Sequence, residues 1–197
     1  SPAVSAFASR PSSPPDAVTA PPQKIMAMLF ADVVGYSTLG EAQVFLFVQH
    51  VLGAVTMLLD SLPRRQRPVV RNTWGDAVYF VFRRVDDAGL VALMLSDVIT
   101  SVDWASLGLP AALSMRISLH AAPLHPVFDP VIQQRNYTGV HTSRAARIEP
   151  ITPPGRVYCS QQFAAIANAL GVSRWSCTYV GTMPLAKHYG HQPVYSV

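Results

Sequence analysis

The chain has 197 residues and a mass of 21.4 kDa, which is enough for one domain and a short tail. Charged residues make up 13% of the sequence and the apolar set AVILMFWYC makes up 50%, which excludes disorder throughout and indicates surface hidden in a partner. The formal net charge is +4, but 13 of the 15 cations are scattered arginines, which favours phosphate binding by single arginines over a nucleic-acid patch.

Cysteine content and hydropathy bear on the compartment. Cys159 and Cys177 are too few for a disulfide framework or a usual zinc site, so we expect a reduced, cytoplasmic protein. Residues 42–59 carry no charge over 18 positions, but glutamine, histidine, glycine and threonine interrupt the run, and we expect no membrane span. Residues 1–23 are rich in Pro, Ser and Ala and predict a disordered tail before a folded domain at 24–197.

The predicted elements follow one another as strand, helix, hairpin, helix and strand, with further elements after them. The expected strands are 24–34, 69–73, 77–82, 114–121, 156–159, 177–182 and 194–197, the expected helices are 41–62, 86–102, 140–148 and 161–170, and a Pro-interrupted ribbon is expected at 125–137. This order predicts an α+β, ferredoxin-like βαββαβ fold with extra C-terminal strands, in which helices cover an antiparallel sheet.

Two acidic residues lie at the ends of predicted strands. Asp32 ends the first strand in FADVVGYS, and Asp76 lies in the WGDAVYF hairpin turn. Neighbouring strands would bring the two acids to one edge of the sheet, where carboxylates suit Mg²⁺ or Mn²⁺ carried in with a nucleoside triphosphate. The alternative is equally open from spacing alone: Asp32 caps the next helix and Asp76 is a solvated turn residue.

The segment after the first strand is a candidate phosphate loop. Gly35 permits close approach, and Tyr36 and Ser37 lead into a helix whose first backbone N–H groups can bind phosphate. Strand–Gly–helix junctions are common, so this signal is weak by itself.

Arginines on a later helix and strand are candidate anion ligands. In TSRAARIEP, helical spacing places Ser143 and Arg144 near Arg147 on one stripe. Arg116 lies on a predicted strand in which polar and apolar residues alternate, so its side chain should point to the face opposite the apolar ones. The alternative for each arginine is a solvated surface position.

Five motifs in order resemble the class III nucleotidyl cyclases, the catalytic domains of adenylyl and guanylyl cyclases. They are LFADVVGYS, NTWGDAVYFVF, MRISLHAAP, GVHTSRAARIEP with PPGRVYCS, and LAKHYG. The resemblance implies that Asp32, Asp76 and the carbonyl of Val33 hold two divalent ions, Mn²⁺ or Mg²⁺. It also implies a head-to-tail homodimer with active sites built from both protomers.

The implied reaction is attack of the ribose 3′ oxygen on the α-phosphorus, with pyrophosphate leaving. The resemblance implies that Arg147 stabilises the charge that develops on the α-phosphate in the transition state. It implies that Arg116 and Lys187 bind the triphosphate. Ser143 stands where the family has an Asn that orients the ribose; its hydroxyl keeps a donor and an acceptor.

Two positions depart from the purine cyclases. Asn72 replaces the Lys or Glu that reads the base, and Asn136 replaces the Asp typical of ATP enzymes. In these respects the chain is similar to the small bacterial pyrimidine cyclases of the Pycsar anti-phage system, which implies UTP or CTP as substrate and a separate effector activated by the cyclic nucleotide. The alternatives are an ATP or GTP cyclase and a catalytically inactive nucleotide-binding module.

Overall fold

The structure is a computed structural model that describes residues 21–185 and 189–197. Most of the predicted tail and the predicted phosphate ligand Lys187 lie outside the described residues. The first strand begins at Lys24.

Eight strands and five α-helices make up the described fold, with short 3-10 turns between some of them. The strands are β1 (Lys24–Val34), β2 (Val70–Trp74), β3 (Ala77–Phe82), β4 (Ser114–Asp129), β5 (Gln134–Thr138), β6 (Val157–Ser160), β7 (Thr178–Pro184) and β8 (His191–Ser196). The helices are α2 (Glu41–Leu46), α3 (Gly53–Ser61), α4 (Val85–Ser101), α5 (Ala145–Ile148) and α6 (Gln161–Ala169).

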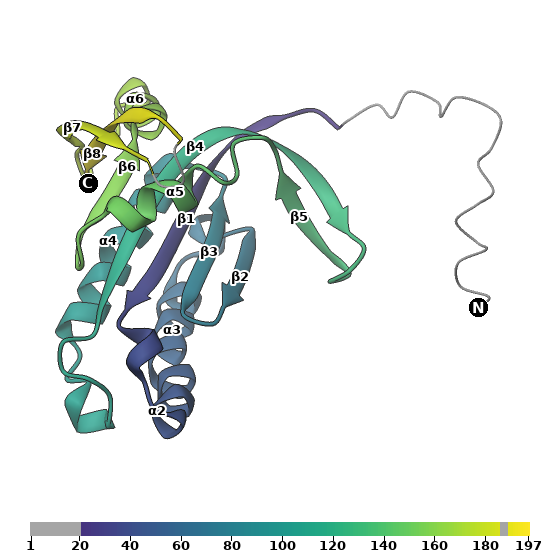
Figure 1. Cartoon of the computed structure of the whole chain (residues 1–197). Coiled ribbons are helices and arrows are strands. Elements are labelled where there is room, and N and C mark those ends of the chain that lie inside the picture. The colour runs from purple at the N-terminus through teal and green to yellow at the C-terminus, as the bar shows by residue number, and fades with distance from the viewer. Residues whose placement is uncertain (1–20, 186–188) are drawn as a thin grey trace, which may run out of the picture.

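The strands form one sheet in the order β2-β3-β1-β4-β6-β8-β7, with β5 pairing the far end of β4. All neighbours are antiparallel except β4 and β6, which are parallel because α5 lies on the connection between them. Helices α3, α4 and α6 cover one face, the short α5 lies on the other, and the β4–β5 hairpin projects from the body (Figure 1). The predicted α+β fold is confirmed, with this parallel pair inside an otherwise antiparallel sheet.

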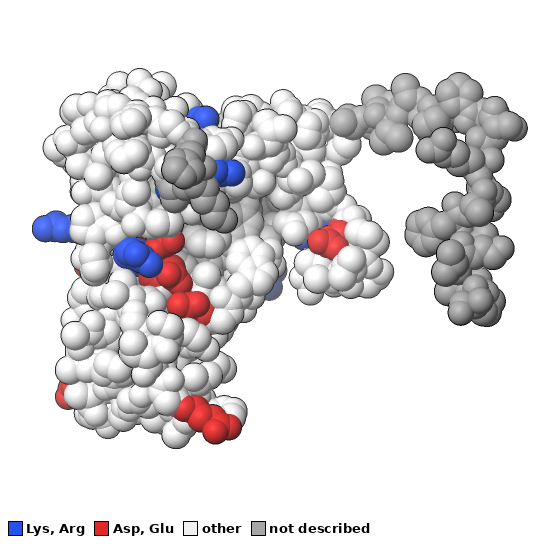
Figure 2. All heavy atoms as spheres, in the orientation of Figure 1, with Lys and Arg blue, Asp and Glu red and all other residues white. Residues whose placement is uncertain are grey.

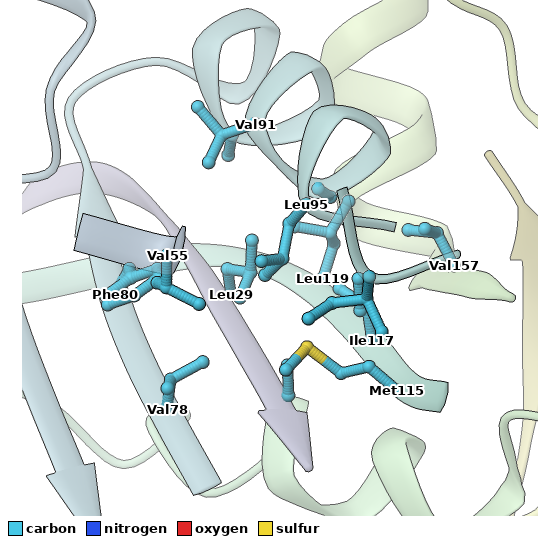
Figure 3. Close-up of a cluster of buried hydrophobic side chains, with 14 of the residues drawn as sticks. Leu29, Val55, Val78, Phe80, Val91, Leu95, Met115, Ile117, Leu119 and Val157 are labelled. Carbon is cyan, nitrogen blue, oxygen red and sulfur yellow. The ribbon is translucent and has the colours of Figure 1, made fainter. Parts of the chain in front are cut away.

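Strict alternation along the central strands gives the sheet two different faces. On β1, Ala27, Leu29, Ala31 and Val33 are buried in the main core beneath the helices, and the residues between them point to the other face. Figure 3 shows this core between sheet and helices, with Leu29 of β1 near Leu95 of α4. The other face carries a smaller buried cluster around Met28 and is otherwise open. Asp32 therefore lies on the open face.

The predicted helix 41–62 contains a π-helical turn. The turn spans Phe47–Leu52 between α2 and α3, and it keeps Phe47 and Val51 fully buried. By length and composition alone the run Glu41–Ser61 could cross a membrane, with a mean hydropathy of 1.8 and 28% of the most apolar window buried. Core helices pass the same test, so this feature is weak evidence for a span.

Two sequence expectations after β4 were wrong. The strand expected to end at 121 continues to Asp129, so the ribbon is one hairpin with β5. The helix expected over 140–148 begins only at Ala145, because three-residue turns precede it: the Thr142 N–H and hydroxyl both donate to the Gly139 carbonyl. Ser143 therefore lies in a turn and Arg147 in a single helical turn.

A buried histidine lies on the open face beneath this turn segment. His120 of β4 is 1% exposed, and its Nδ1 lies 2.7 Å from the hydroxyl of Ser160, which also accepts the N–H of Phe163 at the start of α6. Burial lowers the pKa of His120 to about 3, with smaller contributions from Arg144 and His141. The ring is therefore neutral in the folded protein at ordinary pH.

This histidine predicts acid sensitivity. Unfolded His120 binds a proton near pH 6.5 and the folded ring does not until about pH 3, so the unfolded state gains protons first as pH falls. The free energy of unfolding should drop by about 2 kcal/mol between pH 6.5 and 5 from this residue. Urea unfolding of wild type and His120→Asn at both pH values measures the drop, and an equal drop in the two proteins would contradict the assignment.

Candidate active site

An ion pair joins the two central strands on the open face. Asp32 of β1 and Arg116 of β4 are direct partners in the antiparallel register, which places their side chains on the same face. The Arg116 Nη2 donates to Asp32 Oδ2 at 3.1 Å, and both side chains are about three-quarters buried. The predicted alternation of β4 thus brings two of the predicted site residues together.

Glu149 is a site residue that the sequence analysis missed. It follows α5 and is 5% exposed, with its Oε1 2.7 Å from the Nε of Arg116. Burial raises the pKa of Glu149 to about 7, although Arg116 acts in the opposite direction. The only signal in the sequence was an acid in an otherwise apolar or basic turn before Pro150. Figure 2 shows acidic atoms gathered beside basic ones on the face drawn, within a mostly uncharged surface.

Asp76 joins this group from the β2–β3 hairpin. Asp32 pairs with Ala77 in the sheet register, so the hairpin turn lies beside the end of β1. Burial, and then the charge of Asp32, raise the pKa of Asp76. A cation between the two carboxylates would stabilise the charged form of Asp76 that Asp32 destabilises.

The residues present fit a divalent cation of hard-oxygen preference. Among the described residues no three His, Cys, Asp or Glu side chains form a metal cluster, so a cation here would rely on the two aspartates with a backbone carbonyl. Val33 buries its side chain in the main core and could contribute only through its backbone. Oxygen donors without imidazole or thiolate suit Mg²⁺ or Mn²⁺ better than zinc.

The loop after β1 makes a tight turn. Gly35 has φ of +85°, a conformation that glycine adopts without strain, and the next three residues form a 3-10 turn that includes Tyr36 and Ser37. The Tyr36 ring packs edge-on against Phe47 at 4.9 Å between centroids. Tyr36 therefore faces the main core and not the open face.

The residues expected to read the base lie together elsewhere on the open face. Asn72, Asn136 and Ser143 line one cavity of about 270 Å³, with Trp74 and Tyr79 among its walls. The Trp74 side chain is 57% exposed, and its ring stacks on the rings of Phe30 and Tyr79 with centroid distances of 6.3 and 6.1 Å. Neither Asp32 nor Asp76 lines this cavity in the described part of the chain.

Arg147 is half-buried and contacts an aromatic ring. Its guanidinium carbon lies 3.7 Å from the centroid of Tyr189, and its Nε is buried with no hydrogen-bond partner among the described atoms. Stacking on Tyr189 orients the guanidinium plane and leaves donors for an anion. The arginine thus lies next to the β7–β8 connection, which contains Lys187 in the sequence.

No protein-family model matches this chain, and no curated protein matches it. Solved structures do. The guanylate cyclase domain of RhGC from Catenaria anguillulae, in complex with GTP, is 16% identical, with a TM-score of 0.72 over 88% of this chain and 96% of that one. The adenylyl cyclase CyaB from P. aeruginosa is 14% identical, with a TM-score of 0.69 over 89% and 94%.

A third match is a dimeric guanylyl cyclase domain of the RhoGC fusion protein from the aquatic fungus Blastocladiella emersonii. It is 14% identical, with a TM-score of 0.71 over 88% of this chain and 96% of that one. These identities establish the fold alone. The chain has the fold of the class III adenylyl and guanylyl cyclase catalytic domains.

Proposed function

We propose that this protein is a nucleotidyl cyclase that converts a nucleoside triphosphate to a 3′,5′-cyclic nucleotide and pyrophosphate. The observation that carries the proposal is the convergence of Asp32, Asp76 and Arg116 on the open face of a cyclase fold. Two acids and an arginine at one strand end suit a triphosphate with its divalent ions.

Each group has a defined part in the proposed reaction, attack of the ribose 3′ oxygen on the α-phosphorus. Asp32 and Asp76, with the Val33 carbonyl, would hold two Mg²⁺ or Mn²⁺ ions, which supply charge neutralisation at the attacking and leaving oxygens. Glu149 contacts the Nε of Arg116 and Asp32 its Nη2, so the two acids fix the guanidinium, which would bind triphosphate oxygens through its other donors. Arg147 meets charge on the α-phosphate, and Lys187 the outer phosphates. The backbone of Gly35, Tyr36 and Ser37 faces the same phosphates.

The active site is proposed to form between two copies of the chain. Within one described chain, neither Asp32 nor Asp76 lines the cavity formed by Asn72, Asn136 and Ser143. Two copies packed head to tail on their open faces would bring the aspartates of one to the cavity of the other. The exposed side chains of Trp74 and Val140, 57% and 84% accessible, would be covered in such a dimer.

The substrate is proposed to be a pyrimidine nucleotide, UTP or CTP. The cavity at Asn72 and Asn136 is small, about 270 Å³, and Trp74 stacked on Phe30 forms part of its wall. The asparagine amides offer both donors and acceptors to the edge of a pyrimidine. A cyclic pyrimidine nucleotide would act as the messenger to a separate effector in antiviral defence.

The first prediction concerns product and metal. With Mn²⁺ and each of UTP, CTP, ATP and GTP, mass spectrometry should detect a cyclic pyrimidine nucleotide as the main product. Asp32→Ala and Asp76→Ala should each reduce product at least about 100-fold, since even groups that only support metal ligands cost about 10–100-fold. Circular dichroism should show that both variants remain folded, because neither carboxylate is part of the hydrophobic core.

The outcomes separate the levels of the proposal. A main product from ATP or GTP would remove the pyrimidine specificity and the antiviral role while leaving the cyclase activity. If no nucleotide gave a product, the remaining interpretation would be a catalytically inactive nucleotide-binding module. Wild-type rates in either aspartate variant would contradict the metal assignment.

The second prediction tests the shared site. Asp32→Ala and Arg147→Ala should each be inactive, and their mixture should recover about a quarter of wild-type activity: half of the randomly mixed dimers are heterodimers with one intact site of two. The matched control mixes Asp32→Ala with Asp76→Ala. These residues serve the same half of each site, so no activity should return.

Equal recovery in both mixtures, or none in the first despite subunit exchange, would overturn the shared site. Exchange is measured with two differently tagged copies of the chain.

A further inference from the structure

A cavity of about 670 Å³ lies at the opposite end of β1 from Asp32. Its walls are the first residues of β1, the junction between β3 and α4, the end of α6 and the loop 171–174. The volume is within the range of about 300–1,000 Å³ that small-molecule sites occupy. Nothing in the proposed cyclase reaction uses these residues.

One part of the lining is aliphatic. Met26, Ala27, Ile166 and Val172 contribute to it. Ile25 and Leu170 also line the cavity, although their side chains are 52% and 67% exposed to solvent. An occupant with an alkyl chain would therefore remove aliphatic surface from water on both sides of the cavity.

The other part of the lining is cationic. Arg83, Arg84 and Arg174 line this cavity, and a second one of about 550 Å³ shares all three and adds Arg65. The acids that face these four arginines from the same cavities are Asp86 and Asp87, which leaves a formal excess of two positive charges. Within the described residues, no carboxylate lies within ion-pair distance of Arg83.

The acids fix the cationic wall. Arg174 lies 2.7 Å from Asp86 and 3.3 Å from Asp87, so the loop 171–174 is tied to the first turn of α4. Next to it, the indole N–H of Trp175 donates to the Asp86 carbonyl at 3.0 Å, and the ring packs so closely on Gly89 that a Cβ there would lie 2.3 Å from it. The wall is therefore formed before any ligand arrives.

We propose that this cavity binds an aliphatic anion, an alkyl chain with a phosphate or carboxylate head. The chain would lie between Ile25 and Leu170, and the head would meet Arg83 with Arg84. Guanidinium groups bind both head groups through paired N–H donors. The lining named here contains no aromatic ring, which favours an alkyl chain over a nucleobase.

The site is independent of the proposed catalysis. Met26 and Asp32 are six positions apart on β1, a span of about 20 Å along the strand. The cavity shares no residue with the aspartates, Arg116 or the asparagines. Binding should therefore be unchanged in Asp32→Ala, whether or not the protein is a cyclase.

Titration calorimetry with the full chain tests the proposal, using decyl phosphate and decanoate below their micelle concentrations, with inorganic phosphate and decanol as half-ligands. At least one anion should bind at least tenfold more tightly than both half-ligands, and the better anion identifies the head group. Arg83→Ala and Leu170→Ser should each weaken it about tenfold. Both residues are exposed, so the fold should survive. The matched control Arg135→Ala changes an exposed arginine on β5, outside the cavity, and should bind like wild type.

Three results would overturn the proposal. One is no binding of either anion by wild type. Another is half-ligands that bind as tightly as the anions. The third is affinity that Arg83→Ala and Leu170→Ser leave unchanged, because the anion would then bind elsewhere.

Discussion

The guanidinium of Arg116 lies between the carboxylates of Asp32 and Glu149, and the open face of the sheet depends on this contact. Asp76 is the third acid at this place, and a buried charge is costly when it has no partner. Burial has the largest effect on the pKa of Glu149 and raises it to about 7, although the ion pair with Arg116 acts to lower it. The ion pair therefore offsets only part of the cost of burying Glu149, and the arginine links β1, β4 and the turn after α5.

The period of two in β1 and β4 was enough to predict which residues share the open face. Arg116, Ser118 and His120 alternate with apolar residues in the sequence, and the register places Arg116 opposite Asp32. The hairpin with a small turn likewise predicted that Asp76 would lie beside the end of β1. Local patterns succeed here because strand geometry allows only two directions for a side chain.

Other features depend on contacts that no local pattern encodes. Glu149 was not among the predicted site residues, because its contact with Arg116 follows only from the packing of its segment on β4. Trp74 is large and apolar, but it belongs to the edge strand β2, and its side chain lies exposed on the open face. The turns at 139–144 replaced a helix because Thr142 bonds back to Gly139, a competition that helical periodicity does not include.

The π-helical turn between α2 and α3 has a consequence for the length of the chain. A π turn holds one residue more than the α-helical path it replaces. A relative lacking one residue within Phe47–Leu52 would close the turn to an ordinary helix and still direct Val55, Leu58 and Leu59 into the core. The same loss inside α3 would rotate every later side chain by about 100°. Single-residue gaps in this helix should therefore concentrate at the π turn.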